Sequence, residues 1–172
     1  MGSVSPQELI GYSDSNWGAD PDKARSTTGL VFLLNGPVSW RARLQQTVAK
    51  SSTAAEFMAL AEGTEEALWL RALLKGLTVE NYGPTKLLCD NSDAIKIAGT
   101  KKTFPKHIDI RYHYVLERIQ SKELILEYVQ TESNLADGFT KPLGSTKFRS
   151  FSNRIVDIFD SAGELKSESN SV

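Results

Sequence analysis

The sequence predicts an α/β domain built on a mixed five-stranded sheet with helices on both faces. Three short apolar runs near the start of the chain are separated by tight turns, which is typical of an antiparallel meander. Two later apolar runs each follow a helical segment, and helical crossovers of this kind place a strand parallel to its neighbour. The predicted order of elements is therefore βββ-α-β-α-α-β-α.

The first half of the chain supplies the meander and the longest helix. The three strands are predicted at residues 9–17, 27–34 and 38–48. Glycine, aspartate and proline at residues 18–22 form the first turn, and an Asn-Gly-Pro sequence at residues 35–37 forms the second. A Ser-Ser-Thr sequence then opens a helix that continues to Leu77 without proline and carries an apolar stripe.

The second half alternates short strands with amphipathic helices. We expect strands at residues 86–89 and 124–129, and helices at 92–98, at 110–121, from near Asn134, and from Pro142 to about Phe159. The predicted domain spans residues 9–160. Residues 1–8 are expected to be a flexible N-terminal segment, and the Ser/Glu/Asn-rich residues 161–172 a disordered tail.

The length, net charge and cysteine content limit the kinds of protein that this chain can be. The 172 residues suffice for one domain with its own core, and the net charge of −1 argues against a strongly basic DNA-binding domain. Cys89 is the only cysteine, which excludes an internal disulfide, and its apolar neighbours predict a buried thiol. Because the chain has neither a long apolar span nor a signal-like segment, we expect a soluble, intracellular domain without membrane contact.

Four acidic residues are the candidate functional groups, and each has a local alternative explanation. Asp14 lies in turn-like sequence that suits an Asx-turn, and Asp137 lies near a helix start that favours an acid. Glu56 fits a capping box with Thr53, which is the stronger local interpretation, and Asp90 could cap the next helix. If the fold gathers the four carboxylates, they could bind paired divalent cations, which prefer oxygen ligands.

The context of the four acids resembles one known family. The stretch from about residue 11 to residue 143 is similar to the ribonuclease H domain of Ty1/copia-type retrotransposon polyproteins. The matching segments are YSDSNWGADPDKARSTTGLVFLLNGPVSW, VAKSSTAAEFMALAEGTEEALWLRALL, LLCDNSDAI, KHIDIRYHYVLERI and EYVQTESNLADGFTKPL. The resemblance implies the ribonuclease H fold, with sheet order 3-2-1-4-5, and it places the family's metal-binding and catalytic acids on Asp14, Glu56, Asp90 and Asp137.

The resemblance also implies a reaction. Two Mg²⁺ ions, replaceable by Mn²⁺, would support endonucleolytic hydrolysis of the RNA strand of an RNA–DNA hybrid, leaving a 5′-phosphate. The expected partners are this hybrid and the reverse transcriptase domain of the same polyprotein, and the isolated domain is expected to be monomeric. Such a domain would act in the cytoplasmic particle of the retroelement and in the nucleus.

Substrate contacts are assigned to polar and basic residues near these acids. The candidates are Ser15, Arg25, Asn91, Lys101, Lys106, His107 and Arg111, together with Lys50 and Lys102. His107 has an equally good structural alternative, in which it packs a helix against the sheet. Trp17 and Trp40 are expected in the core, with stacking on nucleotides as the alternative.

Two departures from the family pattern and two competing functions stay open. The loop at residues 130–133 lacks the histidine that many relatives carry, and Gly138 replaces a usual apolar residue. The domain could be a non-catalytic module that binds nucleic acid or protein, although all four acids are intact. An integrase-like strand transferase would use Glu127 after Asp90, but Glu127 is predicted to face solvent and Glu56 would then have no role.

Overall fold

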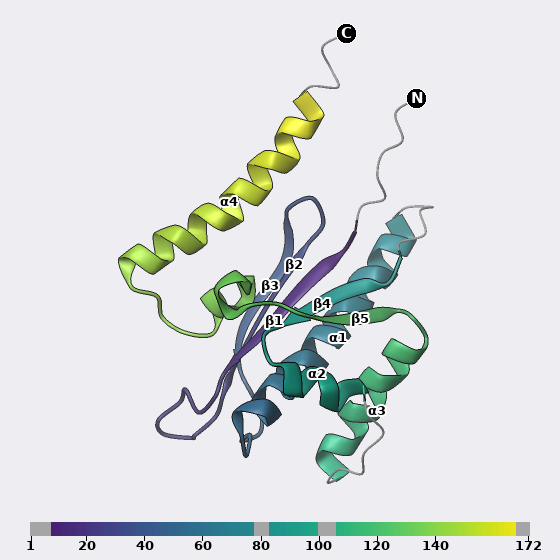
Figure 1. Cartoon of the computed structure of the whole chain (residues 1–172), viewed down its shortest axis with the longest axis vertical. Helices are drawn as coiled ribbons and strands as arrows, with labels where there is room; N and C mark the ends of the chain where they lie inside the picture. The colour runs from purple at the N-terminus through teal and green to yellow at the C-terminus, as the bar shows by residue number, and fades with distance from the viewer. Residues whose placement is uncertain (1–7, 78–82, 100–105, 168–172) are drawn as a thin grey trace.

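A mixed five-stranded sheet in the order β3-β2-β1-β4-β5 forms the centre of the domain (Figure 1). The computed structural model describes residues 8–77, 83–99 and 106–167. The strands are β1 (Ile10–Asn16), β2 (Thr27–Leu33), β3 (Pro37–Leu44), β4 (Thr85–Cys89) and β5 (Leu124–Tyr128). The first three pair antiparallel, whereas β4 is parallel to β1 and β5 is parallel to β4. This topology confirms the predicted sheet.

Helices cover both faces of the sheet, as predicted. On one face, α1 (Ser52–Leu77), α2 (Ser92–Gly99) and α3 (Lys106–Gln120) pack against one another and against the strands. On the other face, the 3₁₀ turn η2 (Leu135–Phe139) contacts β1 and β2, and α4 (Ser145–Ser167) contacts β3. A second 3₁₀ turn, η1 (Thr131–Ser133), joins β5 to η2.

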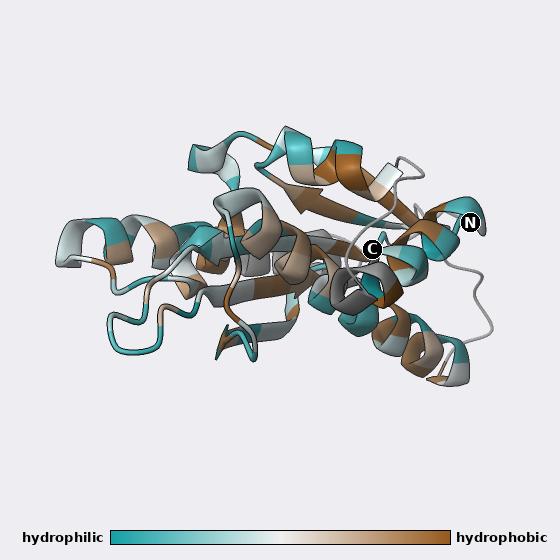
Figure 2. Cartoon of the chain, turned by 90° about the horizontal axis from the view of Figure 1, so that it is seen from below, coloured by the Kyte–Doolittle hydropathy of each residue, from teal (hydrophilic) through white to brown (hydrophobic). Residues whose placement is uncertain are grey.

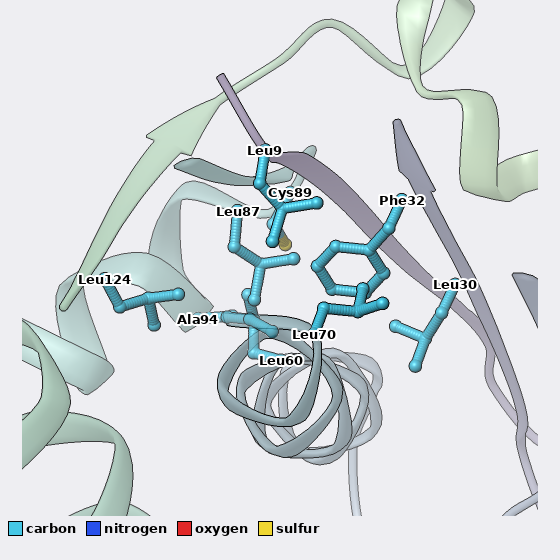
Figure 3. Close-up of a cluster of buried hydrophobic side chains, with 10 residues drawn as sticks. Leu9, Leu30, Phe32, Leu60, Leu70, Leu87, Cys89, Ala94 and Leu124 are labelled. Atoms are coloured by element: carbon cyan, nitrogen blue, oxygen red, sulfur yellow. The ribbon is translucent and has the colours of Figure 1, made fainter. Parts of the chain in front are cut away.

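The core lies between α1 and the sheet. Figure 3 shows strand side chains pointing toward α1, among them Leu30 and Phe32 of β2 and Leu87 of β4, which meet Leu60 and Leu70 of the helix. The largest of these side chains are fully buried, and their removal from water supplies most of the stabilising free energy. In Figure 2 the strands carry long hydrophobic stretches, whereas hydrophobic and hydrophilic residues alternate along the helices.

Strand order places the carboxyl ends of β1 and β4 side by side at the middle of the sheet. Ser13 is paired with Cys89 across the parallel β1–β4 ladder, and Asp14 is paired with Gly29 across the antiparallel β1–β2 ladder. In open α/β sheets such adjacent carboxyl ends are where functional sites form. Asp14 and Asp90 are therefore brought together by topology, although 76 positions separate them.

Three expectations about the first half of the chain were wrong. β3 ends at Leu44 rather than at residue 48, because Gln45 turns inward. Its buried amide donates to Thr28 Oγ1 at 3.1 Å and to Ala55 O at 3.0 Å. Trp17 and Trp40 are exposed at 54% and 63%, not buried in the core. The chain turns away after β1 at Trp17, and Trp40 lies on the edge strand β3, where it lines a surface hollow with Phe139 of η2 and Phe148 of α4.

The end of the chain also differs from the expectation. The helix predicted from near Asn134 is the short 3₁₀ turn η2, and the long helix starts only at Ser145. That helix continues to Ser167, past residue 161, where disorder was expected to begin. Within the described parts of the chain, no helix is both long and apolar enough to cross a membrane.

Candidate active site

Asp14 lies within β1 at the centre of the sheet rather than in a turn. Its carboxylate is buried and accepts a hydrogen bond from Thr140 Oγ1 at 2.8 Å. The strand continues to Asn16, so the Asx-turn alternative is wrong for this residue. A chain segment 126 positions away therefore holds the Asp14 carboxylate in place.

Glu56 points from the first part of α1 toward β1. Its Oε1 accepts hydrogen bonds from Ser15 N at 3.2 Å and from Ser15 Oγ at 2.8 Å. The helix is capped instead by Ser51, whose Oγ accepts from Ala54 N at 3.1 Å. The capping-box alternative for Glu56 is therefore wrong, and its carboxylate is committed to the end of β1.

Asp90 follows the last residue of β4 and stands beside Glu56 and Cys89. Ligand atoms of these three residues lie within 4.8 Å of one another, and Cys89 Sγ lies 3.8 Å from Glu56 Oε2. The cap of α2 is Asn91, whose Oδ1 accepts from Asp93 N and Ala94 N at 3.1 and 3.0 Å. Asp90 is thus not needed as a helix cap. Cys89 is fully buried, as predicted.

Asp137 is carried by η2, which is fixed over the sheet. The buried Asn134 side chain donates to Ser13 O at 3.0 Å and accepts from Ala136 N at 3.0 Å. Asp137 forms an ion pair with Lys141, four residues later. The same turn places Thr140 against Asp14, so η2 positions both an acid and the hydrogen-bond donor of a second acid.

Two glycines make room for this arrangement. A Cβ on Gly29 would lie 2.5 Å from Ala136 O, so a side chain there would push η2 away from β2. A Cβ on Gly138 would lie 2.4 Å from the ring of Phe151, which packs edge-on against Phe139 with centroids 5.3 Å apart. Gly138, the departure noted in the sequence, thus lets α4 pack against the turn that bears Asp137.

The carboxylates influence one another electrostatically. Burial, together with the charges of Asp90 and Asp137, raises the pKa of Asp14 to about 6, against the lowering effects of the Thr140 hydrogen bond and the charge of Lys141. Burial and the charge of Asp14 raise the pKa of Glu56 to about 8, against the hydrogen bonds from Ser15. The structure therefore brings the four predicted acids into one cluster.

The donor set suits divalent cations. Asp14 and Glu56 are each only 6% exposed, and burial is the largest cause of their raised pKa values, so a bound cation would favour their charged forms. Carboxylate oxygens are preferred by Mg²⁺ and Mn²⁺. Burial and the charge of Glu56 raise the pKa of the Cys89 thiol, which keeps this neighbour protonated and a poor metal ligand. The residues present therefore fit a hard metal.

The predicted substrate contacts have mixed outcomes. Ser15 and Asn91 lie beside the acids, but Ser15 bonds Glu56 and the Oδ1 of Asn91 caps α2. Arg25, in the β1–β2 connection, and Arg111, on α3, are partly exposed, and Lys50 is exposed just before α1.

Several other predictions concern residues outside the described regions. Lys101 and Lys102 lie between residues 99 and 106, outside the described residues. Lys106 and His107 lie in α3, but the structure does not describe their side chains. The ring of His113 contacts Tyr112 edge-on, with centroids 5.4 Å apart.

Three further residues belong to the site and were not among the residues predicted for it, namely Asn134, Thr140 and Lys141. Thr140 and Lys141 follow Asp137 by three and four positions, the spacing at which side chains meet on a helical turn. That spacing was the available signal for Lys141. Nothing local signals the contacts of Asn134 with Ser13 and of Thr140 with Asp14, because they cross 121 and 126 positions.

Known proteins with similar sequences include retrotransposon polyproteins. The chain is 37% identical over 150 residues to the retrovirus-related Pol polyprotein from transposon RE1 of Arabidopsis thaliana, covering 86% of the chain and 10% of that protein. It is 35% identical over 145 residues to that from transposon TNT 1-94 of Nicotiana tabacum, covering 81% of the chain and 11% of that protein. No protein-family model matches the sequence.

Solved structures with the same fold are ribonucleases H and reverse transcriptases. LC11-RNase H1, isolated from compost by a metagenomic approach, superposes with a TM-score of 0.58 at 15% identity, over 77% of this chain and 92% of that one. The chain belongs to the retrovirus-related Pol polyproteins of copia-type transposons, and its fold is that of a ribonuclease H. A foamy viral protease-reverse transcriptase in complex with an RNA/DNA hybrid superposes with a TM-score of 0.58 at 13% identity, over 81% of this chain and 20% of that one.

The chain spans about a tenth of the length of the polyproteins that it matches, so it corresponds to one of their parts. Glu127 is exposed on β5, and the glutamate beside Asp90 is Glu56. This arrangement disfavours the integrase-like alternative.

Proposed function

We propose that this domain hydrolyses the RNA strand of RNA–DNA hybrids during reverse transcription of a copia-type retroelement. The observation that carries the proposal is the convergence of Asp14, Glu56, Asp90 and Asp137 from four separate elements of a ribonuclease H fold. A structural role alone does not explain the buried carboxylates of Asp14 and Glu56, because their burial is costly without a cation.

Divalent metal is the cofactor that this site fits. Asp14, Glu56, Asp90 and Asp137 would hold two Mg²⁺ ions, and Mn²⁺ has the same ligand preference. When bound, such ions supply an activated water and neutralise the charge that develops on the phosphate and on the leaving 3′ oxygen.

The protein's own residues orient the acids. Ser15 donates two hydrogen bonds to one oxygen of Glu56, which leaves Oε2 directed toward Cys89 and the neighbouring Asp90. Thr140 fixes one oxygen of Asp14, and Asn134 ties η2 to β1. Preorganised ligands reduce the reorganisation that substrate binding requires.

The substrate and partners follow from the same proposal. Asn91 Nδ2 and the basic residues Arg25 and Arg111 would contact the hybrid, and 2′-hydroxyl contacts would select RNA on the cut strand. A reverse transcriptase domain of the same polyprotein would help to hold the hybrid, with the enzyme acting in the cytoplasmic particle of the element and in the nucleus. Hydrolysis would leave a 5′-phosphate and a 3′-hydroxyl.

Cleavage of an end-labelled RNA–DNA hybrid at low salt tests the proposal. We expect cutting of the RNA strand alone with Mg²⁺ or Mn²⁺, and loss of cutting in Asp14→Asn. The matched control is Asp93→Asn, an exposed acid on α2 whose carboxylate pairs with Lys96; this variant should cut at the wild-type rate. Hybrid binding without cutting by the wild type would contradict the proposal and favour the non-catalytic module.

A further inference from the structure

A polar hollow of about 440 Å³ lies beside Asp137, between the two 3₁₀ turns and α4. Figure 1 shows α4 running past the short turn that follows β5. The charged residues lining the hollow are Asp137, Glu132, Lys141, Lys147 and Arg154. Because Asp137 belongs to both, the hollow is continuous with the carboxylate cluster.

The walls of the hollow are held in place by specific contacts. The Arg154 guanidinium of α4 donates to Glu132 O at 2.8 Å and to Ser133 O at 3.0 Å, which ties the helix to η1. Phe151 of α4 packs edge-on against Phe139 of η2. The hollow therefore exists before any ligand arrives, and a ligand would not have to order its walls.

The charge of the hollow favours an anion. Three cationic side chains face two acids, and the charge of Asp137 is already matched by its ion pair with Lys141. Glu132 is exposed on η1, at the rim of the hollow. Lys147 is exposed in the first turn of α4 and forms no ion pair with any residue that the structure describes. Its ammonium group is thus available to an incoming ligand.

We propose that this hollow binds a backbone phosphate of the nucleic acid strand that is cut at the carboxylate cluster. Lys147 would be the principal contact, since a lysine ammonium group binds phosphate oxygens as a point charge. A phosphodiester carries one negative charge and has strong acceptor oxygens. One such group would therefore balance the positive charge of Lys147. The proposal rests on the proposed function, because it takes the nucleic acid substrate as given.

The experiment measures hybrid binding without cleavage. Fluorescence anisotropy with a labelled RNA–DNA hybrid would be recorded in Mg²⁺ over a series of salt concentrations, with Asp14→Asn as the parent protein so that the probe stays intact. Lys147→Ala would be compared with Lys75→Ala. Lys75 is an exposed lysine in the last turn of α1, about 28 Å along the helix axis from Glu56.

We expect Lys147→Ala to weaken binding several-fold and to reduce the slope of log Kd against log salt by about one, the effect of losing one phosphate contact. Lys75→Ala should leave both quantities unchanged, and Lys147→Arg should retain them. Lys147 is exposed, so thermal unfolding of the variant should match that of the parent.

Two results would overturn the subsite. One is an equal Kd and slope for Lys147→Ala and Lys75→Ala, and the other is no hybrid binding by the parent at low salt. An effect of Lys147→Ala in a protein that does not cut RNA would uphold the subsite while the nuclease proposal fails. Active cleavage with no effect of Lys147→Ala on binding would overturn the subsite alone.

Discussion

Replacing Glu56 by glutamine tests whether the buried carboxylate destabilises the metal-free fold. Burial, with the charge of Asp14, raises the pKa of Glu56 from 4.5 to about 8. The folded protein therefore binds this proton more tightly than the unfolded chain does. The contribution of Glu56 to the free energy of unfolding is therefore most favourable below pH 4.5 and falls as the pH rises toward 8. Since one pKa unit corresponds to about 1.4 kcal/mol, the loss accumulated between pH 4.5 and pH 7 is about 3 kcal/mol.

Glutamine keeps the shape of the side chain but removes its charge. Its Oε1 can still accept both hydrogen bonds from Ser15, so the packing of α1 against β1 should persist. We expect Glu56→Gln to be more stable than the wild type by about 3 kcal/mol at pH 7 and equal to it near pH 4. Urea unfolding followed by tryptophan fluorescence, in the presence of a chelator, measures the difference at each pH.

The control is Glu65→Gln, which removes an exposed carboxylate from the same helix and should change stability by less than about 0.5 kcal/mol. Adding Mg²⁺ should stabilise the wild type by mass action and the Glu56→Gln variant much less, because a ligand is missing. A variant that is no more stable than the wild type at pH 7, with a difference independent of pH, would refute the electrostatic reasoning.

Two further substitutions test the supports of the site. Thr140→Val removes the hydrogen-bond donor to Asp14 and should raise the pKa of Asp14 above 6 by about one to two units. The reason is that a hydrogen bond to a charged group contributes about 1.5–3 kcal/mol. Carboxyl ¹³C NMR titration of the metal-free protein measures this pKa. Thr140→Ser should titrate like the wild type, and an unchanged pKa in Thr140→Val would show that the bond does not matter. Gly29→Ala places a Cβ 2.5 Å from Ala136 O and should cost about 1–3 kcal/mol of stability and slow cleavage by displacing η2. A Gly29→Ala variant that unfolds at the wild-type temperature and cleaves at the wild-type rate would contradict this expectation.

Strand and helix patterns predicted most of the fold. Apolar runs and turn residues located all five strands, because a half-buried strand and a tight turn each impose a local composition. The limits of β3 were missed because Gln45 is a polar residue that the fold buries with two hydrogen bonds. Trp17 and Trp40 were misplaced because a large aromatic side chain resembles a core residue whether or not another element covers it.

The four acids of the site were found through their sequence context rather than through local chemistry. For Asp14, Glu56 and Asp90, the local alternatives of turn, capping box and helix cap all proved wrong. Ser51 and Asn91 perform the capping instead, which frees the acids for one another. Local rules cannot choose between two polar residues one to five positions apart, because several of them can supply the same hydrogen bond.

The sequence by itself determined the order of strands and helices and the family to which the chain belongs, because these depend on periodicity and on long motifs. Only the tertiary structure decided which donors hold the acids, that η2 rather than a regular helix carries Asp137, and that Gly29 and Gly138 are required by close approach. These features depend on contacts between different elements, some of them more than one hundred positions apart, such as Thr140 with Asp14 and Asn134 with Ser13. No local pattern encodes the distance between two such atoms, because packing of the whole domain sets it.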